Sequence, residues 1–163
     1  DNLLKHLNPK NEFLGNSLDV NKITYKDVRS LVKLLKSGND WDSIYDIFDI
    51  CFDVSKGRFY EASIVEFYQA RNFVFDYVVS TQKRESSLLQ SIGVDVELWK
   101  AAGGERLNKF SDLMPLVQLG ELFSIYPFDL QKKPYNEILV LLVALKERGE
   151  VNQQFSKLKS KIK

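Results

Sequence analysis

The sequence predicts an all-α protein: a helical bundle of about six to eight helices organised on one long central helix, with an irregular N-terminal arm. Apolar side chains recur at intervals of three and four residues along most of the chain, which is the period of an amphipathic helix. Residues 58–92 contain neither glycine nor proline, so we expect a long helix over about 58–91. Only NKITYKDV has a strand-like composition, and it is short.

The composition indicates a globular protein with no global preference for nucleic acid. The chain has 163 residues, 44% of them hydrophobic, and its 11 phenylalanines and 7 tyrosines are enough for a substantial core. The net charge is +1, which is no basic surplus. The longest apolar run, 138–145, is far shorter than the roughly 20 residues that span a bilayer. The single cysteine excludes an internal disulfide and a thiolate metal cluster.

Residues 1–22 are expected to form the N-terminal arm, draped over the domain or over a neighbouring molecule. Pro9 disfavours helix at the residue before it, and glycine and polar residues follow. There is no continuous apolar stretch, so we expect no signal peptide here. The remainder, 23–163, is predicted to be one helical domain, or two packing units (23–80 and 93–163) joined by the long helix.

The first helix is predicted over about 25–37. Thr24 followed by Asp27 has the spacing of a capping box, and Val28 begins an apolar series at helical intervals. Gly38 lies where a left-handed C-terminal cap is expected.

A second helix, predicted over about 41–54 after Asn39 or Asp40, carries an acidic stripe. Four carboxylates share one face at offsets of four, three and four: Asp42, Asp46, Asp49 and Asp53. One interpretation is a solvated face, neutralised by Lys or Arg from a neighbouring helix. The other is a partner-binding stripe for a basic protein. A metal site is disfavoured, because a straight helix cannot wrap several oxygens around one ion.

The second half of the long helix becomes polar at Ser80. Its apolar residues there, Leu88, Leu89 and Ile92, are too few for a core and too many to be left in water. The helix either breaks near Ser80 or continues, and we favour a continuous helix. We therefore predict a long-helix patch that binds a partner.

Glycines and prolines divide the C-terminal half into short helices. Gly103 and Gly104 are expected to form a flexible joint before a helix over about 105–114. A helix with Pro115 in its first turn follows, and Pro134 is placed to open the last long helix.

The last helix is predicted to be very apolar at first and amphipathic later. Residues 138–145 are apolar on nearly every side, so we expect them to be the most buried segment of this half. Gly149 either ends this helix or merely softens it. Beyond it an apolar stripe continues at offsets of four, three and four: Val151, Phe155, Leu158 and Ile162.

Four lysines surround this stripe as a basic C-terminal tail: Lys157, Lys159, Lys161 and Lys163. Short lysine-rich ends are usually solvated tails. The same lysines fit an acidic protein partner or the phosphates of nucleic acid.

No group of residues identifies a reaction. His6 is the only histidine and lies in the arm, with no organised carboxylate near it in sequence. Cys51 lies on the apolar face of the second helix, as expected for a buried, inert thiol. The Gly103-Gly104 pair follows no strand and lacks the lysine of phosphate loops. We therefore expect a non-enzymatic protein without catalytic residues, metal or cofactor.

Residues 119–150, LGELFSIYPFDLQKKPYNEILVLLVALKERGE, place a helix end at Leu122-Phe123, a break at Tyr126-Pro127, one helical turn, and then a long helix. This order resembles the C-terminal helical pattern of small accessory proteins of tailed bacteriophages, such as tail assembly chaperones and head–tail or other virion components. The resemblance implies a structural protein that takes part in protein–protein interaction, during tail assembly or inside the particle.

We therefore expect a helical protein-interaction or structural component of a bacteriophage particle or its assembly pathway, in the virion or the host cytoplasm. Its partners would be other protein subunits, phage structural proteins or further copies of itself, and no membrane. The alternative is a nucleic-acid-associated or regulatory helical protein that uses the basic C-terminal tail with Lys83 and Arg84. Binding through phosphates would weaken steeply with salt, which separates the two.

Overall fold

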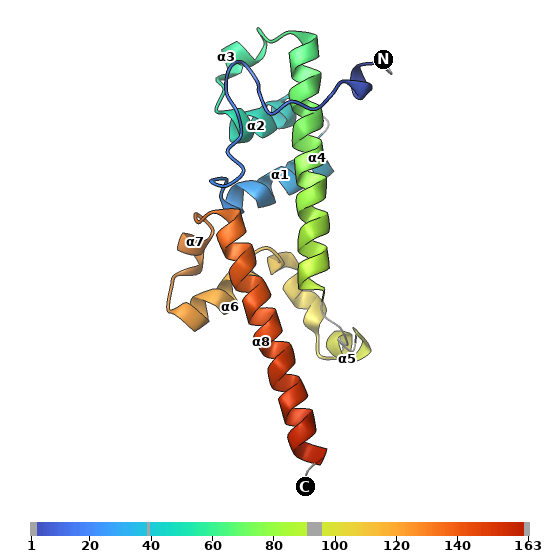
Figure 1. Cartoon of the computed structure of the whole chain (residues 1–163), viewed down its shortest axis with the longest axis vertical. Helices are drawn as coiled ribbons and strands as arrows, with labels where there is room; N and C mark the ends of the chain where they lie inside the picture. Colours follow the sequence, from blue (N-terminus) through green and yellow to red (C-terminus); the bar gives the residue numbers. More distant parts are fainter. Residues whose placement is uncertain (1–2, 39, 91–95, 162–163) are drawn as a thin grey trace. The chain divides into compact units, whose positions relative to one another are not determined.

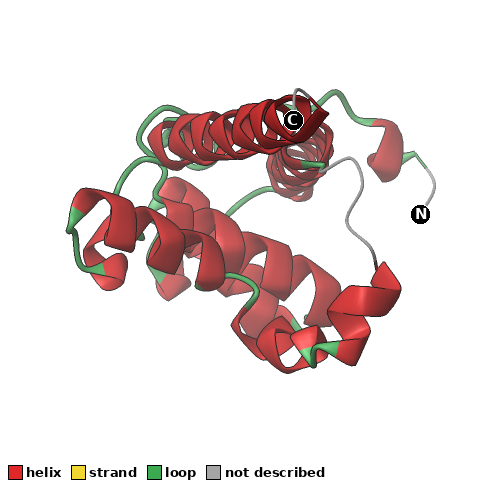
Figure 2. Ribbon diagram, turned by 90° about the horizontal axis from the view of Figure 1, so that it is seen from below, coloured by secondary structure: helices red, strands yellow, loops and turns green. Residues whose placement is uncertain are grey.

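Every regular element in the described residues is helical, which confirms the predicted all-α class. The computed structural model describes residues 3–38, 40–90 and 96–161. The chain is divided into two compact units, Asp1–Arg84 and Glu85–Lys163. Figures 1 and 2 show the elements of the described residues: η1 (Leu4–His6), α1 (Tyr25–Ser37), α2 (Trp41–Phe52), α3 (Lys56–Phe59), α4 (Ile64–Leu89), α5 (Val96–Ala101), η2 (Gly104–Phe110), α6 (Met114–Phe123), α7 (Pro127–Leu130) and α8 (Tyr135–Lys161).

The first helix, α1, begins and ends where the sequence predicts. Thr24 Oγ1 accepts a hydrogen bond from the Asp27 backbone N–H at 3.1 Å and donates one to the Asp27 carboxylate at 2.6 Å. The predicted left-handed cap at Gly38 is wrong, because this residue is extended, with φ −103° and ψ 112°. Glycine is needed there for space: an added Cβ would lie 2.4 Å from the Ser43 Cβ. Gly38 therefore lets the first turn of α2 approach the end of α1.

The second helix, α2, ends at Phe52 rather than at residue 54. The Asp40 carboxylate caps its start by accepting a hydrogen bond from the Ser43 backbone N–H at 2.8 Å. At the other end Asp53 is left-handed, with φ 49°, and its N–H donates to the Asp49 carbonyl at 2.8 Å. Aspartate tolerates this conformation, so the helix ends without a glycine.

The long helix α4 begins at Ile64, so its predicted start at about 58 is wrong. The short helix α3 and the residues after it, 60–63, precede it. The Glu66 backbone N–H donates to Ser63 Oγ at 3.2 Å, which satisfies one of the free N–H groups at the helix start. From Ile64 the helix runs without a break to Leu89, which confirms the predicted continuity through residues 80–87.

Aromatic rings form the core of the first unit, and the central ring comes from the N-terminal segment. Phe13 is 0% exposed, and its ring centroid lies 4.6 Å from that of Phe48, 5.8 Å from Phe52 and 5.9 Å from Phe59. Phe67 of α4 stacks on Phe48 at 5.1 Å. Aromatic side chains bury large areas, so residues 1–22 contribute a main core contact of this unit.

Polar side chains of α4 hold the N-terminal segment against this helix, and Figure 1 shows the segment crossing it. The Leu14 backbone N–H donates to the Glu66 carboxylate at 2.7 Å, and the Asn72 side chain donates to the Leu7 carbonyl at 2.9 Å. These bonds satisfy backbone groups of a segment with little regular structure of its own.

In the second unit, residues 104–110 form the 3-10 helix η2 rather than the predicted α-helix over 105–114. Gly103 before it is left-handed, with φ 78°, which glycine adopts at little cost. The side chains from Glu105 to Phe110 are all exposed. Without a buried face, this segment lacks the tertiary packing that stabilises most short α-helices.

A tight turn joins α6 to α7, and it needs Gly120. Ser124 ends α6 in a left-handed conformation, with φ 54°. An added Cβ on Gly120 would lie 2.6 Å from the Ile125 carbonyl oxygen, so the chain passes directly over this position. Pro115 and Pro127 occupy the first turns of α6 and α7, where proline removes no helical hydrogen bond.

The last helix, α8, runs from Tyr135 to Lys161 and passes through Gly149 without ending. Residues 138–145, predicted to be the most buried segment of this half because they are apolar on nearly every side, are buried on one side only: Ile138, Leu139 and Leu142 are buried, whereas Val140 is 68% exposed. Only one face of α8 is buried, and it comes from the first turns: Tyr135, Ile138, Leu139 and Leu142.

Candidate functional site

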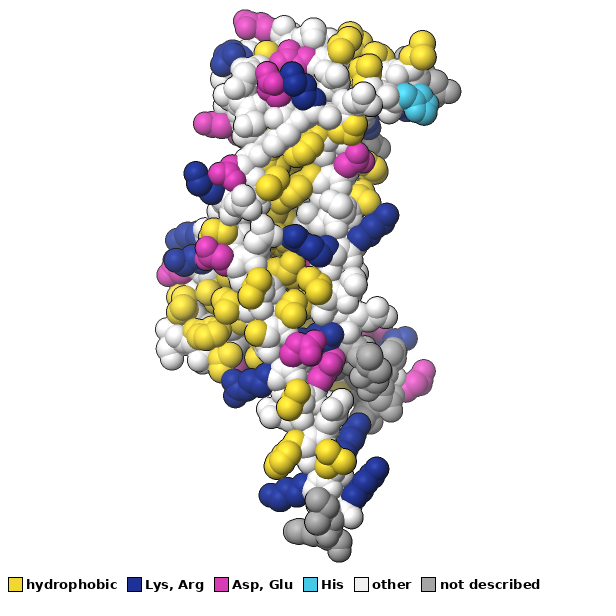
Figure 3. All heavy atoms as spheres, in the orientation of Figure 1, with side chains coloured by type: hydrophobic (Ala, Val, Ile, Leu, Met, Phe, Trp, Pro, Cys, Tyr) yellow, Lys and Arg dark blue, Asp and Glu magenta, His cyan; other side chains and the backbone are white. Residues whose placement is uncertain are grey.

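The distal part of α8 carries three exposed apolar side chains on one face. Val151, Phe155 and Leu158, here called the distal stripe, are 61%, 65% and 61% exposed. A helix turns by about 100° per residue, so these three positions lie within about 60° of one another around the helix axis. Val140 lies about three turns before Val151, on the same face. Figure 3 shows apolar side chains on the surface along this end of the chain.

The distal stripe faces away from the buried side of α8. Leu142 is 6% exposed, and Val151 follows it by about two and a half turns, on the opposite side. Every side chain from Val151 to Lys161 is exposed, and Figure 1 shows this end of α8 extending beyond α6 and α7. Over these last turns, the side of α8 that is buried nearer its start carries polar residues: Gln153, Ser156 and Ser160. The apolar face therefore changes sides halfway along α8.

One flank of the distal stripe reverses its charge along the helix. Because a helix turns by about 100° per residue, five residues of this flank lie within about 80° of one another around the helix axis. In chain order they are acidic, then neutral, then basic: Glu147, Glu150, Gln154, Lys157 and Lys161. The carboxylates of the two glutamates lie 3.8 Å and 3.6 Å from Lys146 Nζ. These distances are too long for hydrogen bonds, so both carboxylates keep accepting capacity.

The predicted basic tail is helical in its described part. Lys157, Lys159 and Lys161 are exposed on the last turns of α8, and Lys163 lies outside the described residues. The three lysines are spread over about 200° around the helix. They therefore do not converge on one side, whereas the distal stripe does.

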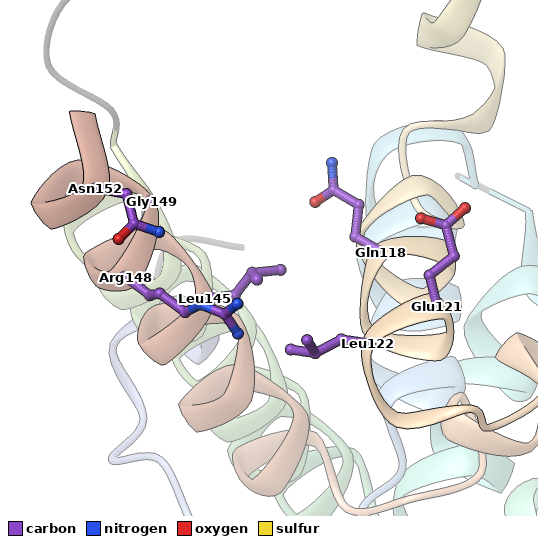
Figure 4. Close-up of a pocket in the computed structure, with 7 residues that line it drawn as sticks. All are labelled: Gln118, Glu121, Leu122, Leu145, Arg148, Gly149 and Asn152. Atoms are coloured by element: carbon purple, nitrogen blue, oxygen red, sulfur yellow. The ribbon is translucent and has the colours of Figure 1, made fainter. Parts of the chain in front are cut away.

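An open groove of about 540 Å³ lies between α6 and α8 of the second unit. Leu122 and Leu145 point into it from the two helices (Figure 4). Polar groups surround them, among them Glu121 and Arg148, and the bare backbone of Gly149 widens the groove. No local sequence pattern predicts this groove, because its two walls come from separate helices that share no motif.

The acidic stripe is exposed at all four positions, Asp42, Asp46, Asp49 and Asp53. Lys56 of α3 forms a salt bridge with Asp42, so one carboxylate has a basic partner from a neighbouring helix. Asp53 follows the last residue of α2 and is left-handed, so it leaves the regular helical face.

The long-helix patch lies beside α8 in the second unit. Leu88 is 39% exposed and Leu89 is half-buried, while Ile92 lies outside the described residues. Lys146 Nζ donates to the Leu88 carbonyl at 3.2 Å. The Tyr135 hydroxyl donates to the Glu85 carboxylate at 2.7 Å. The chain itself thus supplies polar contacts to this end of α4.

The single cysteine and the single histidine have different surroundings. Cys51 is 4% exposed, and burial raises the pKa of its thiol to about 12, so the nucleophilic thiolate is suppressed at neutral pH. His6 is exposed and lines a shallow groove with Arg71 and Asp76. Among the described residues, no three His, Cys, Asp or Glu side chains are grouped to hold a metal ion. None of the described helices combines the length and apolar character needed to cross a bilayer.

Comparisons with protein-family models, with curated proteins and with solved structures find no match to this chain.

Proposed function

We propose that this chain is a non-enzymatic protein-interaction module that binds through the distal stripe of α8. The observation that carries the proposal is the change of apolar face along this helix. Val151, Phe155 and Leu158 are more than half exposed on the side opposite the buried residues. Apolar side chains grouped on one exposed face mark interaction sites more often than isolated ones do.

The chemistry of the helix end supports a helical partner. An amphipathic helix commonly binds through apolar side chains spaced at three and four residues. Phe155 supplies the large aromatic anchor that contributes most at such interfaces. The flanking charges give such an interface its orientation.

A role in the assembly of a tailed bacteriophage particle is the narrower form of this proposal. It rests on the resemblance of residues 119–150, in which α6, α7 and α8 follow one another in the quoted order. If it holds, purified particles or assembly intermediates contain the chain, and mass spectrometry of such preparations detects it. Its absence from both, in cells that make it, removes the phage role and leaves the general proposal intact.

The test compares three forms of the full chain as bait in cells that make it naturally. The stripe variant carries Val151→Gln, Phe155→Gln and Leu158→Gln. The back-face variant is the matched control on the opposite side of the helix, with Gln153→Ala, Ser156→Ala and Ser160→Ala. Each captured protein is identified, purified and titrated against all three forms.

We expect the wild type and the back-face variant to bind such a partner equally, and the stripe variant to bind at least tenfold more weakly. Equal binding by all three forms would refute the proposal. Duplex DNA in a parallel titration tests the nucleic-acid alternative. That alternative gains support only if binding depends on the three described lysines of the tail and falls steeply between about 50 and 200 mM salt.

A further inference from the structure

We infer that the distal stripe is covered by a second copy of this chain, in an antiparallel pair of α8 helices. The inference deepens the proposed function, because it names the partner of the same surface. It rests on the self-complementary order of side chains along residues 147–161.

The apolar residues fit a two-stranded pairing. Val151, Phe155 and Leu158 recur at offsets of four and three, which is the seam of a heptad repeat. In an antiparallel pair, Val151 of one copy packs against Phe155 of the other, and the reverse contact forms by symmetry. The same register sets Leu158 against Arg148. The methylene groups of arginine can cover a leucine while its charged end stays in water.

The charges select the antiparallel direction. In that register Glu147 lies beside Lys161 of the other copy, on the edge of the seam. Gln154 meets its own counterpart near the two-fold axis. The acidic half of each flank therefore faces the basic half of its partner. A parallel pair would instead place two lysine-rich ends side by side.

The Glu147 carboxylate on this flank is open to such a contact, because its side chain is 62% exposed. Among the described residues, the salt bridges of Glu147 and Glu150 are with Lys146 of their own helix, at 3.8 Å and 3.6 Å. The Glu150 side chain is only 34% exposed and its Oε1 is buried, so Glu147 is the carboxylate that Lys161 of a second copy would reach.

The paired surface is small, so the association should be weak and dependent on concentration. Each copy contributes about 15 residues, fewer than the roughly 20–30 residues per side of a standard interface. We expect a monomer–dimer equilibrium with a dissociation constant in the micromolar range, which tightens at low salt.

A charge swap in the full chain tests the pairing. Sedimentation equilibrium between about 1 and 500 µM measures dimerisation of the wild type, Glu147→Lys, Lys161→Glu and the double variant. Each single reversal replaces two attractive contacts by two repulsive ones, so we expect the dissociation constant to rise about three- to tenfold. The double variant should return to the wild-type value. A different protein as partner would not carry the compensating reversal, so the double variant would not regain binding to it.

A cysteine at the symmetry axis tests the direction. Gln154→Cys should form a disulfide-linked dimer under mild oxidation, whereas Ser156→Cys on the back face should not. Buried Cys51 is the internal reference for a thiol that stays reduced.

The outcomes separate this inference from the proposed function. A wild type that stays monomeric at 500 µM and a Gln154→Cys chain that does not cross-link would overturn the second copy as occupant. If the stripe variant then still loses a purified protein partner, the proposed function stands. If the wild type dimerises but the double variant fails to restore the dimer, the antiparallel register is wrong and the inference falls.

Discussion

Leu142 and Val151 lie on one helix and face opposite directions. Leu142 belongs to the buried side of α8 and is 6% exposed, whereas Val151 begins the distal stripe and is 61% exposed. The same helix thus anchors its unit with one face and presents apolar side chains with the other. Substitutions at the two positions should differ in their effect on the free energy of unfolding, because burial determines what each side chain contributes to stability.

The distal stripe should contribute little to folding. We expect the stripe variant to unfold within about 2 °C of the wild type, since exposed side chains lose little on substitution. Leu142→Ala, on the buried face, should cost about 2–5 kcal/mol. Thermal unfolding followed by circular dichroism measures both. A cooperative loss of stability in the stripe variant would mean that the chain packs this stripe internally.

Two helical glycines should respond in opposite ways to alanine. At Gly120 an added Cβ would lie 2.6 Å from the Ile125 carbonyl oxygen, so Gly120→Ala should destabilise the protein by about 1–3 kcal/mol. At Gly149 an added Cβ meets nothing within 4 Å. Gly149→Ala should therefore stabilise the protein by about 0.5–1 kcal/mol, because alanine favours helix. Urea denaturation of the pair gives the sign of each change, and a stabilising Gly120→Ala would contradict the tight α6–α7 turn.

The start of α4 depends on Ser63. Ser63→Ala removes the oxygen that accepts the Glu66 N–H at 3.2 Å, and should cost about 1 kcal/mol. Ser87→Ala, on the exposed end of the same helix, is the control and should be neutral within about 0.5 kcal/mol. Hydrogen exchange of the first turn of α4 locates the effect. Equal exchange in the two variants would show that the cap is dispensable.

The hydroxyl of Tyr135 should stabilise the second unit. Tyr135 is 1% exposed and donates to the Glu85 carboxylate at 2.7 Å. Tyr135→Phe keeps the ring and removes this bond, so we expect a loss of about 1–3 kcal/mol in the free energy of unfolding. Tyr126→Phe, at a ring that is 63% exposed, is the control and should change stability little. Equal values for the two variants would show that the hydroxyl bond contributes nothing measurable.

The cap of α2 should make the protein sensitive to acid. The backbone N–H of Ser43, with its hydroxyl, lowers the pKa of the Asp40 carboxyl in the folded protein. A lowered folded pKa means that the stabilisation is complete above the unfolded pKa of about 3.9 and is lost as the pH falls through the folded pKa. Asparagine also caps helices but does not titrate there.

Urea midpoints at several pH values test this dependence. We expect Asp40→Asn to match the wild type near pH 6 and to lose less stability below about pH 4. Asp46→Asn, on the exposed face of α2, is the control, because it removes a negative charge from the same helix and leaves the Asp40 cap in place. A parallel acid response of Asp40→Asn and the wild type would exclude the Asp40 cap as its source.

Local sequence signals placed several helix boundaries correctly. Thr24 and Asp27 mark the start of α1, and Asp40 marks the start of α2, because capping side chains act on residues two or three positions away. Ser63 and Glu66 are a local signal for the start of α4. The helix was nevertheless predicted to begin at about 58, because no glycine or proline follows that position.

Tertiary contacts decided what periodicity left open. Residues 1–22 look irregular in sequence, yet Phe13 is fully buried among Phe48, Phe52 and Phe59. No local pattern predicts that contact, because the segment has no repeating structure and its partners lie far along the chain. The groove between α6 and α8 was missed for the same reason.

The sequence by itself determined the helical class, several helix boundaries and the apolar spacing of Val151, Phe155 and Leu158. These features depend on hydrogen bonds and spacing within a few turns of one helix. Only the tertiary structure decided which apolar stripe of α8 is buried. Val140 and Leu142 are equally apolar and two residues apart, but only Leu142 packs against its unit. Burial depends on neighbours that are distant in the chain. Because the Leu142 side of α8 packs against its unit, the opposite side, which carries the distal stripe, is exposed.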